Sequence, residues 1–271
     1  MHNRGNLRKM ETGYDQGHPS VPVRYSLPVG PELIYLNELA GTSVRFEYMN
    51  KINCIHCGRE TRQSFAQGYC YPCFISLPQT DACILNPEKC QAHLGISRDM
   101  EWSERNCLRD HFVYLALSPG LKVGVTRESQ VPVRWIDQGA WEAIKLAVTP
   151  NRYTAGTIEV ELKKHLSDKT NWRHMLTGLR IPDIDLRLEK KRVSSLIPDE
   201  MQQYLIEDDK IYSFEYPVEE YPTKLKTLNF DKNSTVEGVL AGIKGQYLIF
   251  NGGYVLNIRK FGGYLVDFYY Q

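Results

Sequence analysis

The segment FVYLALSPGLKVGVT, residues 112–126, contains two apolar runs on either side of a Ser-Pro-Gly turn. Short runs rich in Val, Leu and aromatic residues, separated by turn residues, are typical of a β-hairpin. Beyond the hairpin, Pro132 can begin a short helix that ends near Gln138, because Gly139 follows. Residues 143–148 are apolar enough for a third strand. The segment therefore predicts a small sheet with a helix inserted before its third strand.

A second helix is expected after the third strand. Thr154 is a plausible N-cap, and the helix would reach about His165. Ile158, Leu162 and Leu166 recur every four residues and so share one face of the helix. Strands and helices in this order predict an α+β fold.

Two closely spaced cysteine pairs precede this region. They are Cys54, Cys57, Cys70 and Cys73. Two residues between ligands allow one tight turn to direct both sulfurs at the same ion, and four thiolates suit the tetrahedral geometry of zinc. Gly58 and Gly68 stand where the backbone must bend. We expect a structural zinc site here, and the alternatives are a redox dithiol or a chance pairing of cysteines.

Five further potential ligands lie within residues 83–111. They are Cys83, Cys90, His93, Cys107 and His111. We expect a second zinc site formed by the three cysteines and His111, with His93 as the substitute ligand. In the alternative reading the cysteines are buried as small hydrophobic residues.

Composition limits the classes of function. The chain has 271 residues and a net charge of +1, so the protein as a whole is not a polybasic coat for nucleic acid. Residues 152–192 contain ten Lys or Arg against six Asp or Glu, which gives a local basic excess or merely a solvated face. Without an apolar leader or a membrane-spanning run, seven cysteines favour a reducing compartment, and we expect a cytoplasmic protein.

Five segments are expected along the chain. They are N-terminal strands with a loosely ordered start (1–50), a zinc-binding segment (51–110), the strand-and-helix core (111–182), a helical connector (183–234) and a β-rich module (235–271). The last segment should form an antiparallel meander with strands at 236–243, 246–250, 254–259 and 264–269. Four strands alone bury little, so the N-terminal strands are expected to join them.

The core resembles the GIY-YIG nuclease superfamily over roughly residues 111–172. Tyr114 stands where the tyrosine of the first signature falls, and residues 122–124 stand for the second signature. Arg134 matches the helix arginine, and Glu159 matches the helix glutamate that holds a divalent metal. The resemblance implies a three-stranded antiparallel sheet flanked by helices and cleavage of phosphodiester bonds.

The resemblance also implies roles for individual residues. Tyr114 would orient or deprotonate the attacking water, and Lys122 would be catalytic in place of the tyrosine of the second signature. Arg127 or Arg134 would brace the phosphate, and Glu159 would ligate magnesium or manganese. Contacts to nucleic acid are expected from Arg127, Arg134, Lys163 and Arg173. The pattern departs from the superfamily at Lys122, where the signature has tyrosine, and at Gln138, where a histidine is common.

The sequence is also similar to an uncharacterised bacterial family, a domain of unknown function. The similarity lies in residues 122–140 and in the cysteine-rich sequence before them. Three functions are compatible with the sequence. The protein is a metal-dependent nuclease, a zinc-containing DNA- or RNA-binding module without turnover, or a zinc-stabilised adaptor for other proteins.

Overall fold

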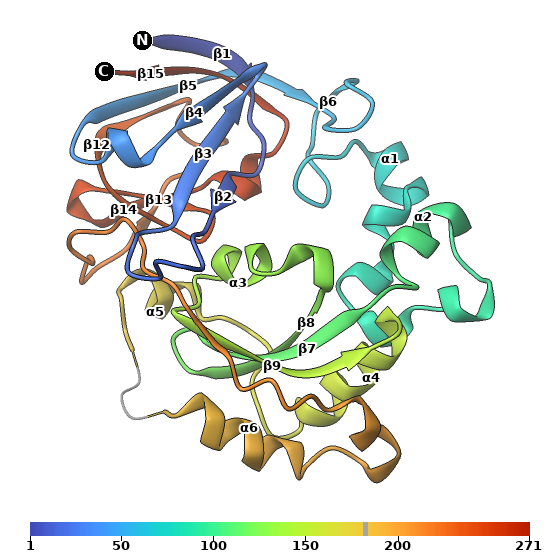
Figure 1. Cartoon of the computed structure of the whole chain (residues 1–271). Coiled ribbons are helices and arrows are strands. Elements are labelled where there is room, and N and C mark those ends of the chain that lie inside the picture. The colour runs from blue at the N-terminus through green and yellow to red at the C-terminus, as the bar shows by residue number, and fades with distance from the viewer. Residues whose placement is uncertain (181–183) are drawn as a thin grey trace. The chain divides into compact units, whose positions relative to one another are not determined.

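The computed structural model describes residues 1–180 and 184–271, and it has the expected α+β composition (Figure 1). The chain forms two compact units. Unit 1 comprises Met1–Ile75, Leu176–Gly178 and Glu215–Gln271, and unit 2 comprises Ser76–Met175 and Leu179–Phe214. The expected segment 51–110 is thus divided between the units. The boundary expected between residues 182 and 183 lies outside the described residues.

Unit 2 is built on an antiparallel sheet with strand order β10-β9-β7-β8. The predicted hairpin is present as β7 (His111–Leu117) and β8 (Leu121–Arg127), with Tyr114 opposite Gly124. The short helix α3 (Val133–Asp137) precedes β9 (Glu142–Thr149), which pairs with β7. Gly139 ends the helix with φ +65°, a conformation that favours glycine. The three expected strands therefore form one sheet, and β10 (Ile211–Ser213) extends it.

Helix α4 (Arg152–Leu162) packs its apolar face against this sheet. The core includes Val113, Leu115, Ile144, Ile158 and Leu162. The helix differs from the prediction at both ends. Its N-cap is Asn151, whose side-chain oxygen accepts the backbone N–H of Thr154 at 2.9 Å, and it ends at Leu162 rather than near His165. Asn151 is the better cap because its backbone is already extended.

The cysteine-bearing part of unit 2 consists mainly of short 3-10 turns. They are η2 (Pro78–Thr80), η3 (Ala82–Ile84), η4 (Pro87–Lys89) and η5 (Ala92–Leu94), followed by α2 (Met100–Asn106). Such short turns bury little apolar surface of their own, so a further cross-link is expected to hold them.

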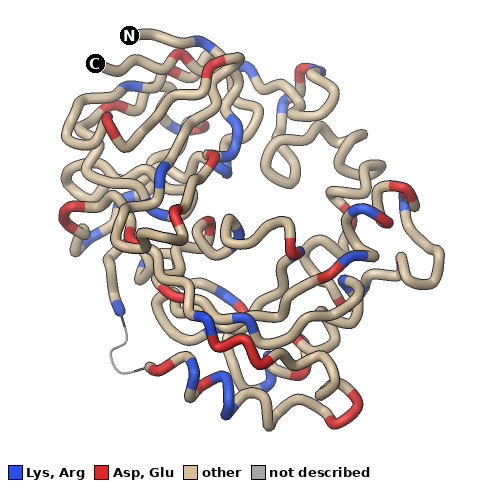
Figure 2. Tube along the Cα trace, in the orientation of Figure 1, with Lys and Arg blue, Asp and Glu red and all other residues tan. Residues whose placement is uncertain are grey.

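Two further helices follow α4 along the chain. They are α5 (Trp172–Leu176) and α6 (Leu186–Ser194), and η7 (Asp199–Tyr204) follows them. Lys, Arg and Glu occur close together along α6 (Figure 2), so this helix is a mixed rather than a purely basic surface. Among the described residues, no helix combines the length and the apolar character that crossing a bilayer requires.

Unit 1 contains the predicted C-terminal meander, joined by N-terminal strands. Its large sheet has the order β1-β15-β5-β12-β13-β14-β11, and β6 pairs with β5. These strands are β1 (His2–Asn6), β5 (Ser43–Asn53), β6 (Glu60–Thr61), β11 (Lys226–Thr227), β12 (Thr235–Lys244), β13 (Tyr247–Phe250), β14 (Tyr254–Asn257) and β15 (Tyr264–Tyr270). A second sheet holds β2 (Glu11–Gly13), β3 (Arg24–Val29) and β4 (Glu32–Tyr35). Unit 1 also carries most of α1 (Tyr71–Ser76).

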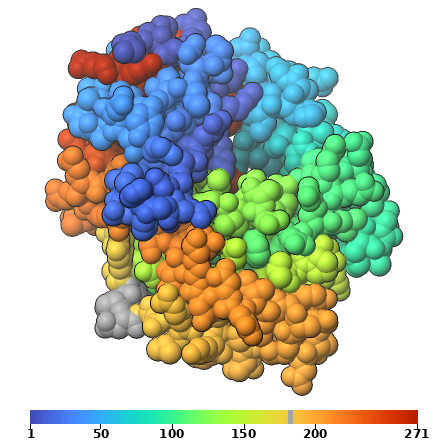
Figure 3. Space-filling model, in the orientation of Figure 1, coloured from blue at the N-terminus to red at the C-terminus, as the bar shows by residue number. Residues whose placement is uncertain are grey.

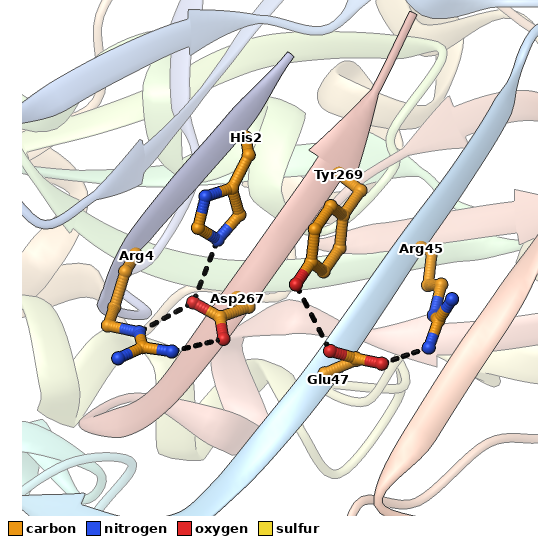
Figure 4. A network of polar contacts seen from close by, with 6 residues as sticks. All are labelled: His2, Arg4, Arg45, Glu47, Asp267 and Tyr269. Carbon is orange, nitrogen blue, oxygen red and sulfur yellow. Dashed lines mark hydrogen bonds and ion pairs between the residues drawn. The ribbon is translucent and has the colours of Figure 1, made fainter.

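The start of the chain, expected to be loosely ordered, is strand β1 in the structure. It runs antiparallel to β15, and the two segments lie side by side in Figure 3. Figure 4 shows the side chains that join them: the buried Asp267 carboxylate accepts from Arg4 Nε at 2.7 Å and from His2 Nε2 at 2.9 Å. Hydrogen bonding from Arg4 lowers the pKa of Asp267 to about 2. The sequence does not indicate that β1 pairs with β15, because the residues of β1 are mostly polar.

Candidate functional site

The first cysteine cluster, Cys54, Cys57, Cys70 and Cys73, has the geometry of a four-thiolate metal site. All four sulfurs lie within 4.8 Å of one another, and the sulfurs of Cys57 and Cys70 are 3.8 Å apart. A tetrahedron with zinc–sulfur bonds of about 2.3 Å has edges of about 3.8 Å. The cluster could therefore hold a metal ion with the size and ligand preference of zinc.

The backbone around this cluster is folded to aim the sulfurs inward. The N–H of Ile55 donates to the carbonyl of Gly68 at 2.8 Å, which ties the two cysteine turns together. Gly68 has φ +144°, and a Cβ there would lie 2.5 Å from the Ile55 side chain. Burial opposes ionisation of Cys54, but backbone N–H groups, including that of Cys57, outweigh it and lower the pKa of this thiol to about 6. Because a side chain at residue 68 would clash with Ile55, glycine is required there for the two cysteine turns to approach each other.

The second cysteine cluster, Cys83, Cys90 and Cys107, lies in unit 2. Its three sulfurs also lie within 4.8 Å of one another, and all three residues are buried. Hydrogen bonds from the neighbouring thiols lower the pKa of Cys107 to about 2, whereas contact with Cys107 raises the pKa of Cys83. One thiolate is thus stabilised at the expense of its neighbours, and all three can ionise together only beside a cation.

The two histidines expected at the second cluster are placed differently. His93 is exposed and stacks on Tyr153, with ring centroids 4.4 Å apart. His111 is 1% exposed and bonds through Nδ1 to the carbonyl of Arg109 at 2.6 Å. Burial lowers the pKa of His111 to about 4, so the ring is neutral at pH 7. Neither ring belongs to the group of three sulfurs.

A polar cluster in unit 2 brings together residues that the sequence singled out from separate elements. The Tyr114 hydroxyl on β7 donates to Gln138 Oε1 at 3.0 Å. Lys122 Nζ on β8 donates to the same oxygen and to Thr170 Oγ1 at 3.2 Å. Tyr114 and Lys122 are 0% and 2% exposed. Gln138 therefore joins Tyr114 and Lys122 through one side-chain oxygen. In the GIY-YIG pattern this position commonly holds a histidine.

Gly124 explains how Tyr114 fits beneath the sheet surface. A Cβ at residue 124 would lie 2.5 Å from the Tyr114 hydroxyl oxygen, so the tyrosine side chain occupies the space that any other residue would need. The Trp135 ring meets Tyr114 edge-on, with centroids 5.7 Å apart. Strand register and these two contacts fix the hydroxyl at one position.

Charged groups surround this hydroxyl. Burial, and to a lesser extent the nearby Arg134 guanidinium, lower the pKa of Lys122 to about 7 against the opposing effect of Glu159. Glu159 is 7% exposed, and its carboxylate lies 3.3 Å from Lys163 Nζ. Burial raises the pKa of Glu159. The cluster thus combines a buried amine, a guanidinium and a buried carboxylate.

Two acidic residues that sequence reasoning missed also act on this cluster. Asp168 lies 3.2 Å from Lys163 Nζ, and Glu88 lies close enough to raise the pKa of Glu159. Glu88 Oε2 is buried without a hydrogen-bond partner in the described structure. Glu88 lies in the cysteine-bearing segment, far from Glu159 in sequence, so no local spacing could have indicated their proximity.

Two of the expected residues lie apart from the Tyr114 cluster. Arg127 contacts Asn106 and lies beside Arg152 and Cys107, so it belongs to the surroundings of the second cysteine cluster. Arg173 is exposed and stacks on Trp172, with its guanidinium carbon 4.4 Å from the ring centroid.

The arrangement at Tyr114 has the components of acid–base and anion chemistry. An amine with a pKa near 7 can accept a proton at neutral pH, and a neighbouring guanidinium can hold an anionic oxygen. Carboxylates from Glu159 and Glu88 are suitable ligands for a hard divalent cation. The orphaned Glu88 oxygen provides a donor that such a cation would satisfy.

Comparison with known proteins shows the family of this chain. It belongs to the family described as protein of unknown function (DUF2797), whose model matches residues 41–266. Membership of a domain-of-unknown-function family, expected from the sequence, is thus confirmed. No curated protein and no solved structure matches the chain.

Proposed function

We propose that this member of the DUF2797 family acts on nucleic acid and cleaves phosphodiester bonds with a divalent metal, through a GIY-YIG-like core. The observation that carries the proposal is the convergence of Tyr114, Lys122 and Glu159, together with Arg134, on one polar cluster. These residues come from two strands and two helices, and they are the residues that the resemblance to the GIY-YIG superfamily indicates.

In this proposal each side chain has a defined task. Lys122, neutral for part of the time at pH 7, accepts the proton of the attacking water. Tyr114 orients that water through its hydroxyl. Arg134 stabilises the charge that develops on the phosphate oxygens. Glu159, assisted by Glu88, would hold a magnesium or manganese ion, which supplies Lewis acidity at the leaving oxygen.

A second candidate is a nucleic-acid-binding module without turnover. It is favoured by Gln138, whose side-chain oxygen accepts from both Tyr114 and Lys122. An amide is not a base at neutral pH, and here it occupies the two groups that catalysis would need. In this alternative Arg134 and Lys163 still bind phosphate, and the zinc-type cysteine clusters support the fold.

The test is cleavage of labelled DNA and RNA by the full chain in the presence of magnesium or manganese. The panel includes single strands, duplexes, branched structures and a folded tRNA. Glu159→Gln is compared with Glu161→Gln, which alters a carboxylate on the same helix that pairs with Lys164 instead. Cleavage by wild type and Glu161→Gln that Glu159→Gln lacks supports the nuclease.

The other outcomes are equally informative. Binding without cleavage, equal in all three proteins, supports the module without turnover. Cleavage that survives Glu159→Gln contradicts the role of this carboxylate. Absence of both binding and cleavage across the panel rejects both candidates.

A further inference from the structure

The second cysteine cluster differs from the first in its number of ligands and in its surroundings. Four sulfurs converge at the first cluster, but three converge at the second. The three cysteines of the second cluster also line a cavity of about 270 Å³. The cavity therefore borders the three-cysteine cluster, whereas a closed structural site has all its positions filled by protein.

In residues 1–180 and 184–271, no further Cys, His, Asp or Glu ligand atom is grouped with the three sulfurs. Both oxygens of the Asp81 carboxylate are used: Oδ1 accepts the N–H of Cys83 at 3.1 Å, and Oδ2 pairs with Arg98 at 3.0 Å. The Ser103 hydroxyl lies against Cys107. His111 does not line the cavity and is not grouped with the three sulfurs, although its Nε2 is buried without a hydrogen-bond partner among the described residues. His93 stacks on Tyr153 instead.

The buried positive charge of Arg152, beside the second cysteine cluster, calls for a negatively charged partner. Arg152 is 8% exposed, and its guanidinium donates to the carbonyls of Cys83 at 3.3 Å and Asn106 at 3.2 Å. Its Nε is buried without a partner, and no carboxylate in residues 1–180 and 184–271 forms an ion pair with it. Buried charges are normally compensated. A divalent ion with three thiolates has a net charge of −1 and provides that compensation.

We propose that Cys83, Cys90 and Cys107 hold a zinc-type ion whose fourth coordination position is open to the cavity. That position takes water, which a small donor ligand from solution can replace. This inference is independent of the nuclease proposal, because it concerns a different cluster and requires no nucleic acid.

The test uses zinc itself as the probe in the full-length double variant Cys54→Ser/Cys57→Ser, which removes two ligands of the first cluster. Zinc content is measured by mass spectrometry, and the ligands are identified by X-ray absorption at the zinc edge. We expect one zinc ion per chain with three sulfurs and one lighter atom. The scattering pattern of imidazole should be absent at first and should appear after imidazole is added.

The matched control is Cys83→Ser/Cys90→Ser, which should retain a four-sulfur ion that does not respond to imidazole. Wild type should bind two ions, with a mean sulfur number between three and four, and this measurement does not depend on the folding of any variant. Imidazole scattering before any addition would show that a histidine, His111 or His93, is the fourth ligand and would overturn the proposal. Four sulfurs, or no zinc at this cluster, would overturn it as well.

Discussion

At the scale of single residues, Lys122 is the most unusual group in the polar cluster. A lysine that is 2% exposed has lost most of its hydration, and a guanidinium lies near it. Desolvation, which disfavours the charged form, is the larger cause, and together with the guanidinium it brings the pKa to about 7 from 10.5. The hydrogen bonds to Gln138 and Thr170 hold the amine in place in either protonation state.

This pKa predicts how stability depends on pH. Between pH 7 and 10.5 the unfolded chain retains the lysine proton that the folded chain has released, so folding becomes more favourable as pH rises. The free energy of unfolding of wild type should therefore rise relative to Lys122→Met by up to about 1.4 kcal/mol per pH unit. Denaturant unfolding between pH 7 and 9 measures it.

The control for this prediction is Lys164→Met, which removes an exposed lysine that pairs with Glu161. Its curve should run parallel to that of wild type. If wild type and Lys122→Met also give parallel curves, the amine is charged in the folded protein throughout, and it cannot serve as the proton acceptor.

At the scale of elements, α4 links the Tyr114 cluster to the second cysteine cluster. It carries Glu159 in its last turns and Arg152 at its start, where the guanidinium reaches the carbonyl of Cys83. Between them, Gly156 lets the helix pack directly on the backbone of η4. A Cβ at residue 156 would lie 2.2 Å from the backbone nitrogen of Glu88. The cysteine-bearing turns therefore support the helix that positions the carboxylate.

Gly156→Ala should separate α4 from η4. Alanine favours a helix by about 1 kcal/mol over glycine, but overpacking against backbone atoms costs about 1–3 kcal/mol or more. Because the clash involves backbone, we expect net destabilisation by about 2 kcal/mol and weaker zinc retention at the second cluster. Denaturant unfolding and zinc content measure both effects. Thr157→Ala, on the same helix, should leave both nearly unchanged; equal values for the two variants would exclude close packing at residue 156.

At the scale of the whole molecule, the sequence predicted the elements better than their partners. The hairpin, α3, β9 and the C-terminal strands follow from local patterns of apolar and turn residues, and all are present. Strand β1 was missed because its residues are polar and its pairing with β15 joins positions 259 to 267 residues apart. Local periodicity contains no signal for such a contact.

At the candidate sites too, local sequence patterns predicted some residues but not how they come together in space. Regular spacing of two residues indicated the first cysteine cluster, whose four sulfurs converge. The second cluster has irregular spacing, and sequence could not show that His93 stacks on Tyr153 or that His111 stays outside the group of sulfurs. Glu88 and Asp168 could not be predicted at the Tyr114 cluster either, because tertiary packing alone brings them to Glu159 and Lys163.

If phosphate binds at the Tyr114 cluster, as we propose, the salt dependence of nucleic-acid binding tests this most directly. Affinity for a labelled nucleic acid is measured over a range of salt concentrations, without divalent metal, for wild type and Arg134→Gln. Arg192→Gln is the control, since this arginine pairs with Glu189 on α6. We predict a steep loss of wild-type affinity with salt and a slope shallower by about one for Arg134→Gln. Identical affinity and slope for wild type and Arg134→Gln would contradict the account.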